Sequence, residues 1–482
     1  MAARRQKLRR ARPTASRVAS AWHTARIATL LAVSCTCAIL VVHLSIVTWT
    51  SEVAINAFPL AHLFATKTRY GKHHETTRLQ QQRQLRATPS KVRLELVQQQ
   101  LVARHGTRFP TLGNIEEIET LLGKLKPIDM SLLPPWLRNY QLPYNASEEG
   151  RLAPQGVKDL AGLAARLLQS TGARPHVFDK SRFRVAHTSK ARTRNSAIAF
   201  ARDYFSNPID AIAEFTTSDM LLRYFDYCKR YDSSVKKNAS AKLEWTKYKS
   251  SEAISQNLER LRSALHLPDH VATNFTVQDV EAAYSACAFD YALYHRTDQW
   301  CSLIEEPIQA VTMDYLDDLK NFYQLGGGHA INYEMAAILL QDIMREIEEA
   351  VRGASNMTAH LRFAHAETTL PLMTLLGFGS RTPLLASFRL DAIKARSFRT
   401  SKWSPFASNI EFRLLQECID EQQGSLTSSH PRFFLQVFIN EHPEKIPGCS
   451  DMLCDIDTVR QLWQRYLEGY DFQKECHITE TD

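Results

Sequence analysis

The chain has 482 residues, more than one small core needs, and its 44% hydrophobic and 23% charged residues are ordinary for a folded protein. The formal net charge is +8, but residues 1–26 contain eight Arg and Lys and no acid, so the rest of the chain is close to neutral. Because the basic excess lies outside the part expected to fold, the charge pattern argues against a nucleic-acid-binding protein.

Residues 27–50 are expected to form a membrane-spanning signal anchor. The stretch Ile27–Trp49 has no charged side chain, and at about 1.5 Å per residue it can cross a hydrocarbon core of about 30 Å. The basic arm before it predicts that residues 1–26 stay in the cytosol and the larger part enters the lumen of the endoplasmic reticulum or Golgi. Secretion after cleavage of a signal peptide, near Ala54–Ala57, and a mitochondrial presequence are the alternatives.

A lumenal location agrees with four glycosylation sequons, which begin at Asn145, Asn238, Asn274 and Asn356. Seven of the nine cysteines lie outside the predicted anchor and show no metal-binding spacing. An oxidising lumen would let some of them pair, and Cys449 with Cys454 and Cys287 with Cys301 are the candidate disulfides. Buried free thiols are the alternative, and the odd count leaves at least one cysteine free or bonded to another chain.

Residues 51–93 are expected to be a polar stem. From residue 66 onward they include three consecutive glutamines and scattered Lys, Arg and Thr with almost no apolar periodicity, which is typical of a flexible spacer. Folding is expected to begin near Leu94, so that residues 94–482 form the folded domain.

Three segments of that domain repeat a pattern of strand, turn and helix. The expected strands contain Leu94–Ala103, then Phe183 and Val185, then Leu361 and Phe363. Such alternation predicts an α/β core sheet flanked by helices. Between Asp210 and Arg352 the apolar periodicity is almost wholly helical, which predicts an inserted α-helical cap at roughly residues 210–352.

Helix boundaries follow from local signals. Asn114 is the expected N-cap of the helix after the first strand, because Glu117 follows three residues later. In the helix after the third strand, Pro371 is expected in the first turn and Gly377 at the end.

The clearest chemical signal is the segment Arg104-His105-Gly106-Thr107-Arg108, directly after the first strand. Ligands of open α/β sheets gather at this end of the strands, and guanidiniums bind phosphate oxygens bidentately. Gly106 is expected to leave room for an anion. A histidine between arginines is favoured in its neutral form, in which it can attack phosphorus. No metal or other cofactor is required, and the sequence shows no acidic cluster suited to one.

Polar groups also follow the other two strands. The second ends in His187-Thr188-Ser189-Lys190-Ala191-Arg192-Thr193-Arg194, and the third ends in His365-Ala366-Glu367. The three strand ends would converge if the strands are neighbours. His365 could then donate a hydrogen bond to phosphate, and Glu367 could protonate the leaving oxygen and later activate water. A His-x-Glu pair by itself is more often a structural polar pair.

The first motif resembles the signature of the histidine phosphatase superfamily, in its acid phosphatase and phytase branch. The sequence His365-Ala366-Glu367 resembles the variant of multiple inositol polyphosphate phosphatases, whereas most acid phosphatases have His-Asp. Other family-like stretches are Tyr315–Lys320, Ser404–Asn409, Asn440-Glu441 and Pro447–Cys449. The resemblance covers roughly residues 94–482 and implies an α/β core with a helical cap.

The resemblance also implies roles for individual residues. It makes His105 the nucleophile and Glu367 the proton donor. The phosphate-binding residues that it implies are Arg104, Arg108, Arg192 and His365. Arg194 is the alternative to Arg192, because only one of the two can face a pocket from a helix. Lys190 is either a specificity contact or a solvated side chain.

The activity implied is hydrolysis of phosphate monoesters, such as inositol hexakisphosphate, through a phosphohistidine. The expected partner is therefore a small phosphate ester, besides the membrane. One alternative is an acid phosphatase for another small ester, such as bisphosphoglycerate, a sugar phosphate or lysophosphatidate. Another is a catalytically dead, phosphate-binding lumenal protein.

Overall fold

The structure, a computed structural model, describes residues 62–71, 93–304, 307–379, 381–418 and 431–477. The predicted basic arm and signal anchor, residues 1–50, lie outside these ranges. Within the described ranges, no helix has the length and apolar character to cross a membrane.

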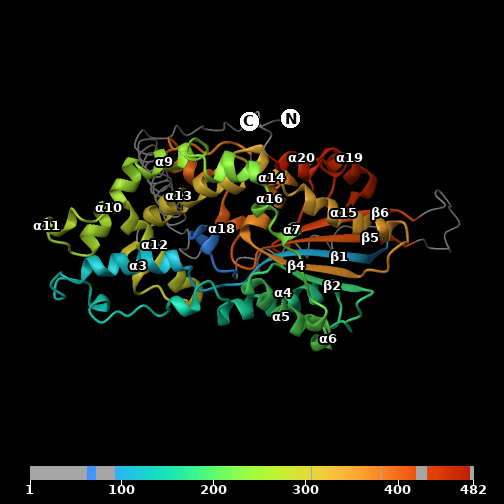
Figure 1. The fold of residues 1–482 in the computed structure, drawn as a ribbon, viewed down its shortest axis with the longest axis horizontal. Helices are drawn as coiled ribbons and strands as arrows, with labels where there is room; N and C mark the ends of the chain where they lie inside the picture. Colours follow the sequence, from blue (N-terminus) through green and yellow to red (C-terminus); the bar gives the residue numbers. More distant parts are fainter. Residues whose placement is uncertain (1–61, 72–92, 305–306, 380, 419–430, 478–482) are drawn as a thin grey trace, which may run out of the picture. The chain divides into compact units, whose positions relative to one another are not determined.

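A mixed sheet lies in the right half of Figure 1, with helices above and below it. Its strand order is β3-β2-β4-β1-β5-β6-β7, and β8 pairs with β6. The strands are β1 (Leu94–Arg104), β2 (Phe183–His187), β3 (Thr216–Thr217), β4 (Ala359–Ala364), β5 (Asn409–Glu417), β6 (Phe433–Ile439), β7 (His442–Glu444) and β8 (Cys454–Asp455).

The three predicted strands are parallel neighbours, with β4 in the middle. Leu361 of β4 lies opposite Leu101 of β1 on one side and Val185 of β2 on the other. Their carboxyl ends therefore meet at one edge, and the predicted α/β core is confirmed. The antiparallel strands β5 to β8 extend the sheet beyond β1 and were not predicted, because no strand-turn-helix pattern marks them.

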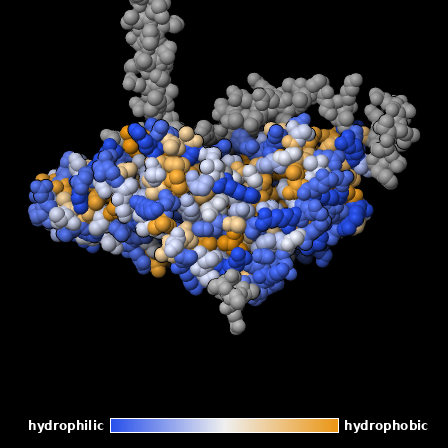
Figure 2. Space-filling view, turned by 90° about the horizontal axis from the view of Figure 1, so that it is seen from above, coloured by the Kyte–Doolittle hydropathy of each residue, from blue (hydrophilic) through white to orange (hydrophobic). Residues whose placement is uncertain are grey.

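Helices cover both faces of the sheet (Figure 1). Side chains alternate along β1, so Leu101 and Ala103 enter one apolar core and Val102 enters the other. The first core is closed by α4 (Pro154–Thr171) and α5 (Ala191–Tyr204), and the second by α15 (Ala337–Val351), α16 (Ala366–Leu375) and α19 (Ile456–Leu467). On the surface shown in Figure 2, hydrophobic residues are interspersed among hydrophilic ones, as is usual for a folded domain.

A second group of helices packs together beside the sheet, mostly within the region where the cap is predicted. Its members are α3 (Leu112–Leu125), α9 (Leu243–Lys249), α10 (Glu252–Ala264), α12 (Val277–Tyr294) and α13 (Pro307–Leu325). The expected bounds of the cap, 210–352, differ from the structure in two ways. Helix α3 packs on α12 although it precedes residue 210, and α15 belongs to the sheet layer because Leu340 and Ile343 share a core with Val102.

The remaining helical segments are short. The α-helices are α6 (Pro208–Ala213), α7 (Asp219–Leu222), α8 (Lys229–Tyr231), α11 (Asp269–Ala272), α14 (Ala330–Glu334), α17 (Leu390–Ala395), α18 (Thr400–Trp403) and α20 (Phe472–Cys476). The 3-10 turns are η2 (Ala65–Lys67), η3 (Pro135–Leu137), η4 (Ala146–Glu148), η5 (Tyr224–Asp226), η7 (Ser240–Lys242) and η8 (Trp300–Ile304), and η6 (Asp232–Lys236) is a π-helical turn.

Two predicted helix starts are wrong. Helix α3 is capped by Thr111, whose hydroxyl accepts a hydrogen bond from the backbone N–H of Asn114, so Asn114 lies inside the first turn. Helix α16 begins at Ala366, which leaves Pro371 in its middle. The predicted end is right, since Gly377 follows the helix with φ +87°.

The described residues 62–71, which we name the N-terminal strap, correct the expectation that folding starts near Leu94. Leu63, Phe64 and Ala65 are fully buried, and the backbone N–H of Ala65 donates to Oδ1 of Asp314 at 2.8 Å. The strap therefore belongs to the folded domain. Its apolar run is too short to show a periodicity, and a polar stretch separates it from β1.

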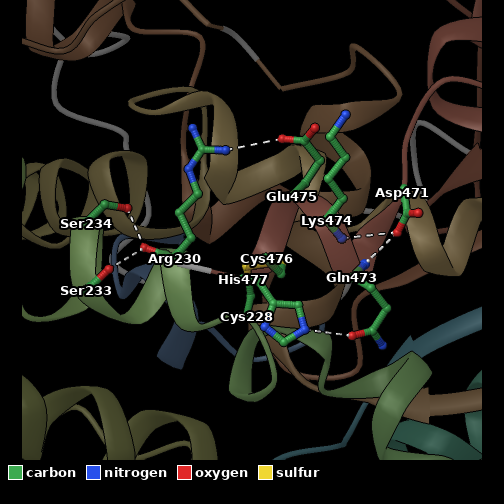
Figure 3. Close-up of a disulfide and its surroundings, with 10 residues drawn as sticks. All are labelled: Cys228, Arg230, Ser233, Ser234, Asp471, Gln473, Lys474, Glu475, Cys476 and His477. Carbon is green, nitrogen blue, oxygen red and sulfur yellow. Dashed lines mark hydrogen bonds and ion pairs between the residues drawn. A yellow bond between two sulfur atoms is a disulfide. The ribbon is translucent and has the colours of Figure 1, made fainter. Parts of the chain in front are cut away.

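Three disulfides join the described cysteines. Cys287–Cys301 and Cys449–Cys454 confirm the two predicted pairs, with Cα separations of 4.6 and 5.7 Å. The third, Cys228–Cys476, joins residues 248 positions apart and was not predicted. It holds α20 against the start of α8, beside an ion pair of 3.2 Å between Arg230 and Glu475 (Figure 3). Among the described cysteines, Cys418 is unpaired.

Candidate active site

The residues that follow β1, β4 and β2 meet at the carboxyl edge of the sheet. His105 follows β1 and His365 follows β4, and their ring centroids are 5.6 Å apart. Thr188 follows β2 and places its hydroxyl 3.0 Å from Nε2 of His365. The predicted convergence of the three strand ends is therefore present.

Backbone and side-chain contacts hold the loop after β1. The N–H of His105 donates to the carbonyl of Ala364, which continues the pairing of β1 with β4. The N–H and hydroxyl of Thr107 both donate to Oδ2 of Asp159 on α4, at 3.0 and 2.6 Å. A glycine is needed at position 106 because α4 approaches closely: a Cβ there would lie 2.7 Å from Cα of Gly156. The expected reason was room for an anion.

The imidazole of His105 is oriented and kept neutral. Nδ1 lies 2.9 Å from the carbonyl oxygen of Gly106, which can only accept, so Nδ1 carries the proton and Nε2 keeps a lone pair. Burial lowers the pKa of His105 well below its usual value, and the positive charges of Arg104 and Arg192 lower it further. The residue as a whole is only 3% exposed. This is the protonation state that a nucleophilic histidine needs.

Three guanidiniums surround this ring, from β1, from the loop after it and from α5. Burial and the charge of Arg108 lower the pKa of Arg104 to about 9, and burial and Arg192 lower that of Arg108 to about 10. All three remain protonated at neutral pH. The buried Nε atoms of Arg104 and Arg192 donate to no acceptor within the described part of the chain. Such N–H groups suit an anion.

The orientation of α5 distinguishes the two candidate arginines of that helix. Nη2 of Arg192 lies 3.4 Å from Nδ1 of His365, and its charge acts on His105, whereas Arg194 is exposed. His365 is also buried, and burial together with Arg192 lowers its pKa. Arg192 is thus the residue that faces the site.

Glu367 lies in the first turn of α16 and is exposed to solvent. Its negative charge raises the pKa values of Arg104, Arg108 and Arg192, against the effect of burial. The carboxylate is therefore close enough to the three guanidiniums for its charge to act on each of them.

Lys190 lies at the N-cap of α5 with an exposed side chain. Hydrogen bonds from Ser189 and the charges of Arg223 and Lys190 lower the pKa of Asp219 against the effect of its partial burial. Arg223, which no motif marked, donates to the hydroxyl of Ser189 at 3.1 Å, and its charge helps to lower the pKa of His365.

One cluster of potential metal ligands lies among the described residues, under β4 and not at the strand ends. It consists of Asp342, Glu346 and His360. The buried guanidinium of Arg362 donates to both carboxylates, at 2.7 and 3.2 Å. Arg362 thus supplies the positive charge that balances the two carboxylates, and the cluster is a buried salt-bridge network between α15 and the sheet.

Two relatives are similar to this chain in sequence over most of its length. Multiple inositol polyphosphate phosphatase 1 of Gallus gallus is 30% identical over 394 residues, which cover 79% of this chain and 84% of the relative. The protein of the same name from Homo sapiens is 27% identical over 406 residues, with 79% and 81% covered.

Solved structures share the fold. The multiple inositol polyphosphate phosphatase of Bifidobacterium longum, in complex with inositol hexasulfate, superposes with a TM-score of 0.64 at 15% identity, over 85% of this chain and 98% of that one. The phytase from D. castellii gives 0.64 at 16% identity, over 81% and 84%. The family model of the histidine phosphatase superfamily (branch 2) matches residues 95–440, and the chain therefore belongs to that family.

Proposed function

We propose that this protein hydrolyses phosphate monoesters of inositol polyphosphates, such as inositol hexakisphosphate, through a phosphohistidine at His105. The observation that carries the proposal is a buried, neutral imidazole whose Nε2 keeps its lone pair among three guanidiniums. The names of the relatives support the substrate class.

The reaction follows from these groups. Nε2 of His105 attacks phosphorus, the new P–N bond forms as the P–O ester bond breaks, and the electron pair leaves on the ester oxygen. Glu367 supplies the proton to that oxygen. Water then attacks phosphorus of the phosphohistidine, and Glu367 takes a proton from that water. The P–N bond breaks, its electron pair returns to Nε2 of His105, and inorganic phosphate leaves. Guanidinium N–H groups stabilise the charge on the phosphoryl oxygens in both steps.

The binding roles are divided between buried and exposed groups. Arg104, Arg108 and Arg192 bind the phosphate that reacts. His365 adds a hydrogen bond from Nδ1 once the phosphate replaces Arg192 at that nitrogen, because Nε2 can then accept from the hydroxyl of Thr188. Lys190 is exposed at the rim, so in this proposal it contacts only a more distant phosphate of the substrate.

The test is phosphate release from inositol hexakisphosphate by the full chain and by His105→Ala. We expect the wild type to be active, and the variant to lose several orders of magnitude in rate while it stays folded. Rapid quenching should trap a phosphoryl group on His105 that is labile to acid and stable to base. Normal turnover by His105→Ala would overturn the mechanism.

We further propose that the protein is a glycosylated, single-pass membrane protein of the secretory pathway, anchored by Ile27–Trp49. The absence of charged side chains from that stretch supports the anchor. Three disulfides fit an oxidising compartment. The sequon asparagines are all exposed, namely Asn145, Asn238, Asn274 and Asn356.

A further inference from the structure

The orientation of Arg104 depends on two backbone carbonyls from distant parts of the chain. Its Nη1 donates to the carbonyl of Thr66 at 2.6 Å and to that of Ser404 at 2.7 Å. Phe406 covers the guanidinium, with its ring centroid 4.7 Å from Cζ. Because Nη1 is committed to the backbone, the rest of the guanidinium, including the unpartnered Nε, is available for a phosphoryl oxygen.

The Thr66 carbonyl belongs to the N-terminal strap, which is itself held in place on both sides of that residue. On one side, Phe64 is fully buried, and its ring centroid lies 5.8 Å from those of Tyr284 and Tyr291. On the other side, the carbonyl of Thr68 accepts a hydrogen bond of 2.9 Å from the N–H of Phe406.

Further along the strap, the hydroxyl of Tyr70 donates to Glu441 at 2.7 Å. Glu441 lies in the turn between β6 and β7, and Arg166 of α4 donates to both of its carboxylate oxygens, at 2.8 and 2.9 Å. The strap is thus attached to the cap, to the loop before β5 and to the turn between β6 and β7, which α4 also contacts. Contacts on both sides of Thr66 therefore hold its carbonyl in place.

We propose that the N-terminal strap is a positioning element of the active site: the Thr66 carbonyl holds Arg104 in the orientation that binds phosphate. The inference rests on the proposed function. It differs from a general role in stability, because it predicts that loss of the strap acts through Arg104.

The first experiment compares two equally buried phenylalanines. Phe64→Ala should displace the strap, whereas Phe275→Ala removes the same side chain from the cap, where Phe275 packs beside Lys124. Per folded molecule, Phe64→Ala should lower kcat/KM for 4-nitrophenyl phosphate by about tenfold or more and raise the inhibition constant for inorganic phosphate. Phe275→Ala should lower stability and leave both values unchanged. Equal values for Phe64→Ala and the wild type would overturn the proposal.

A double-mutant cycle tests the route of the effect. In an Arg104→Ala background, Phe64→Ala should change kcat/KM by less than about twofold, because the group that the strap positions is already absent. Additive losses would show that the strap acts elsewhere. If Phe64→Ala does not fold, Thr68→Val takes its place, since the hydroxyl of Thr68 accepts from the N–H of Phe64 at 3.2 Å and closes the turn.

A cleavage experiment uses the full chain with a protease site inserted between residues 72 and 92. Cleavage alone should leave activity intact, because the strap is held by contacts within the domain. Removal of the cleaved segment in mild denaturant should abolish activity, and a synthetic peptide of residues 59–74 should restore it. Activity that persists without the segment would overturn the proposal. An inactive uncleaved wild type would instead refute the proposed function.

Discussion

At the scale of single residues, burial and charge act on His105 in the same direction. Both lower the pKa of the imidazole, and the hydrogen bond from Nδ1 to Gly106 leaves Nε2 available. A histidine in water is mostly protonated below about pH 6.5. Burial and the arginine charges therefore favour the neutral form of the proposed nucleophile in weakly acidic solution.

The pKa of His105 leads to a prediction on pH dependence. Because protonated His105 cannot attack phosphorus, the acid limb of kcat/KM reports its pKa. Removal of a neighbouring positive charge must raise that pKa, so Arg104→Gln should move the acid limb to higher pH. The measurement is the pH profile with 4-nitrophenyl phosphate for wild type, Arg104→Gln and, as a control, Arg194→Gln. A limb that stays in place or moves to lower pH would contradict the assignment.

Glu367 leads to a prediction that depends on the leaving group. An inositol alkoxide needs a proton in order to leave, whereas a nitrophenolate needs it less. Glu367→Gln should therefore lower turnover of inositol hexakisphosphate by about 10²- to 10⁴-fold and impair the phosphorylation step of 4-nitrophenyl phosphate distinctly less. Pre-steady-state bursts separate that step from dephosphorylation.

Glu149→Gln is the matched control for Glu367→Gln. Glu149 is also an exposed carboxylate, and its charge raises the pKa values of Arg108 and Arg192. We expect little effect from it. If Glu149→Gln lost more activity than Glu367→Gln, Glu149 would be the acid.

At the scale of elements, the face of α5 decides which of two arginines lies beside His365. Arg192 and Arg194 are two positions apart on α5, so they point in widely different directions. Arg192→Gln should lower kcat/KM by about 10²- to 10³-fold, as expected for a lost donor to the transition state. Arg194→Gln should stay within about twofold of the wild type. The reverse order, measured on one substrate, would show that α5 turns its other face to the site.

The disulfides also act at this scale, by joining elements. Cys228–Cys476 closes 248 residues, whereas Cys449–Cys454 closes five. Loss of the long link should cost about 5 kcal/mol and loss of the short one about 2 kcal/mol, because a longer loop has more unfolded-state entropy to lose. Thermal unfolding of the two double Cys→Ser variants is the measurement. An equal fall in Tm would mean that local packing around α20, shown in Figure 3, matters more than loop length.

At the scale of the whole molecule, the anchor and the glycans can be tested together. If Ile27–Trp49 is an uncleaved anchor, the full chain should stay with membranes after a carbonate wash and shift in size on glycosidase treatment. A soluble product that starts near residue 58 would show a cleaved signal. Absence of glycan would favour the mitochondrial alternative. Asn→Gln at each exposed sequon would identify the sites in use.

The sequence by itself determined the parts of this protein that depend on neighbouring residues. The strand and the Arg104–Arg108 motif are contiguous, and so are the segments that begin at His187 and at His365, so an α/β sheet with a site at the carboxyl ends of these strands could be predicted. The apolar periodicity of the cap helices is likewise local. The two disulfides with short separations were predictable for the same reason.

Only the tertiary structure decided what depends on distant contacts. It selected Arg192 over Arg194, paired Cys228 with Cys476 and placed Thr66 against Arg104. It also showed that the missing side chain of Gly106 leaves room for α4. Whether two distant residues meet depends on how the whole chain packs. The entropy cost of closing the loop between them grows only slowly with their separation, so the separation does not predict which distant residues meet. Such contacts leave no local pattern, as the short apolar run of the strap demonstrates.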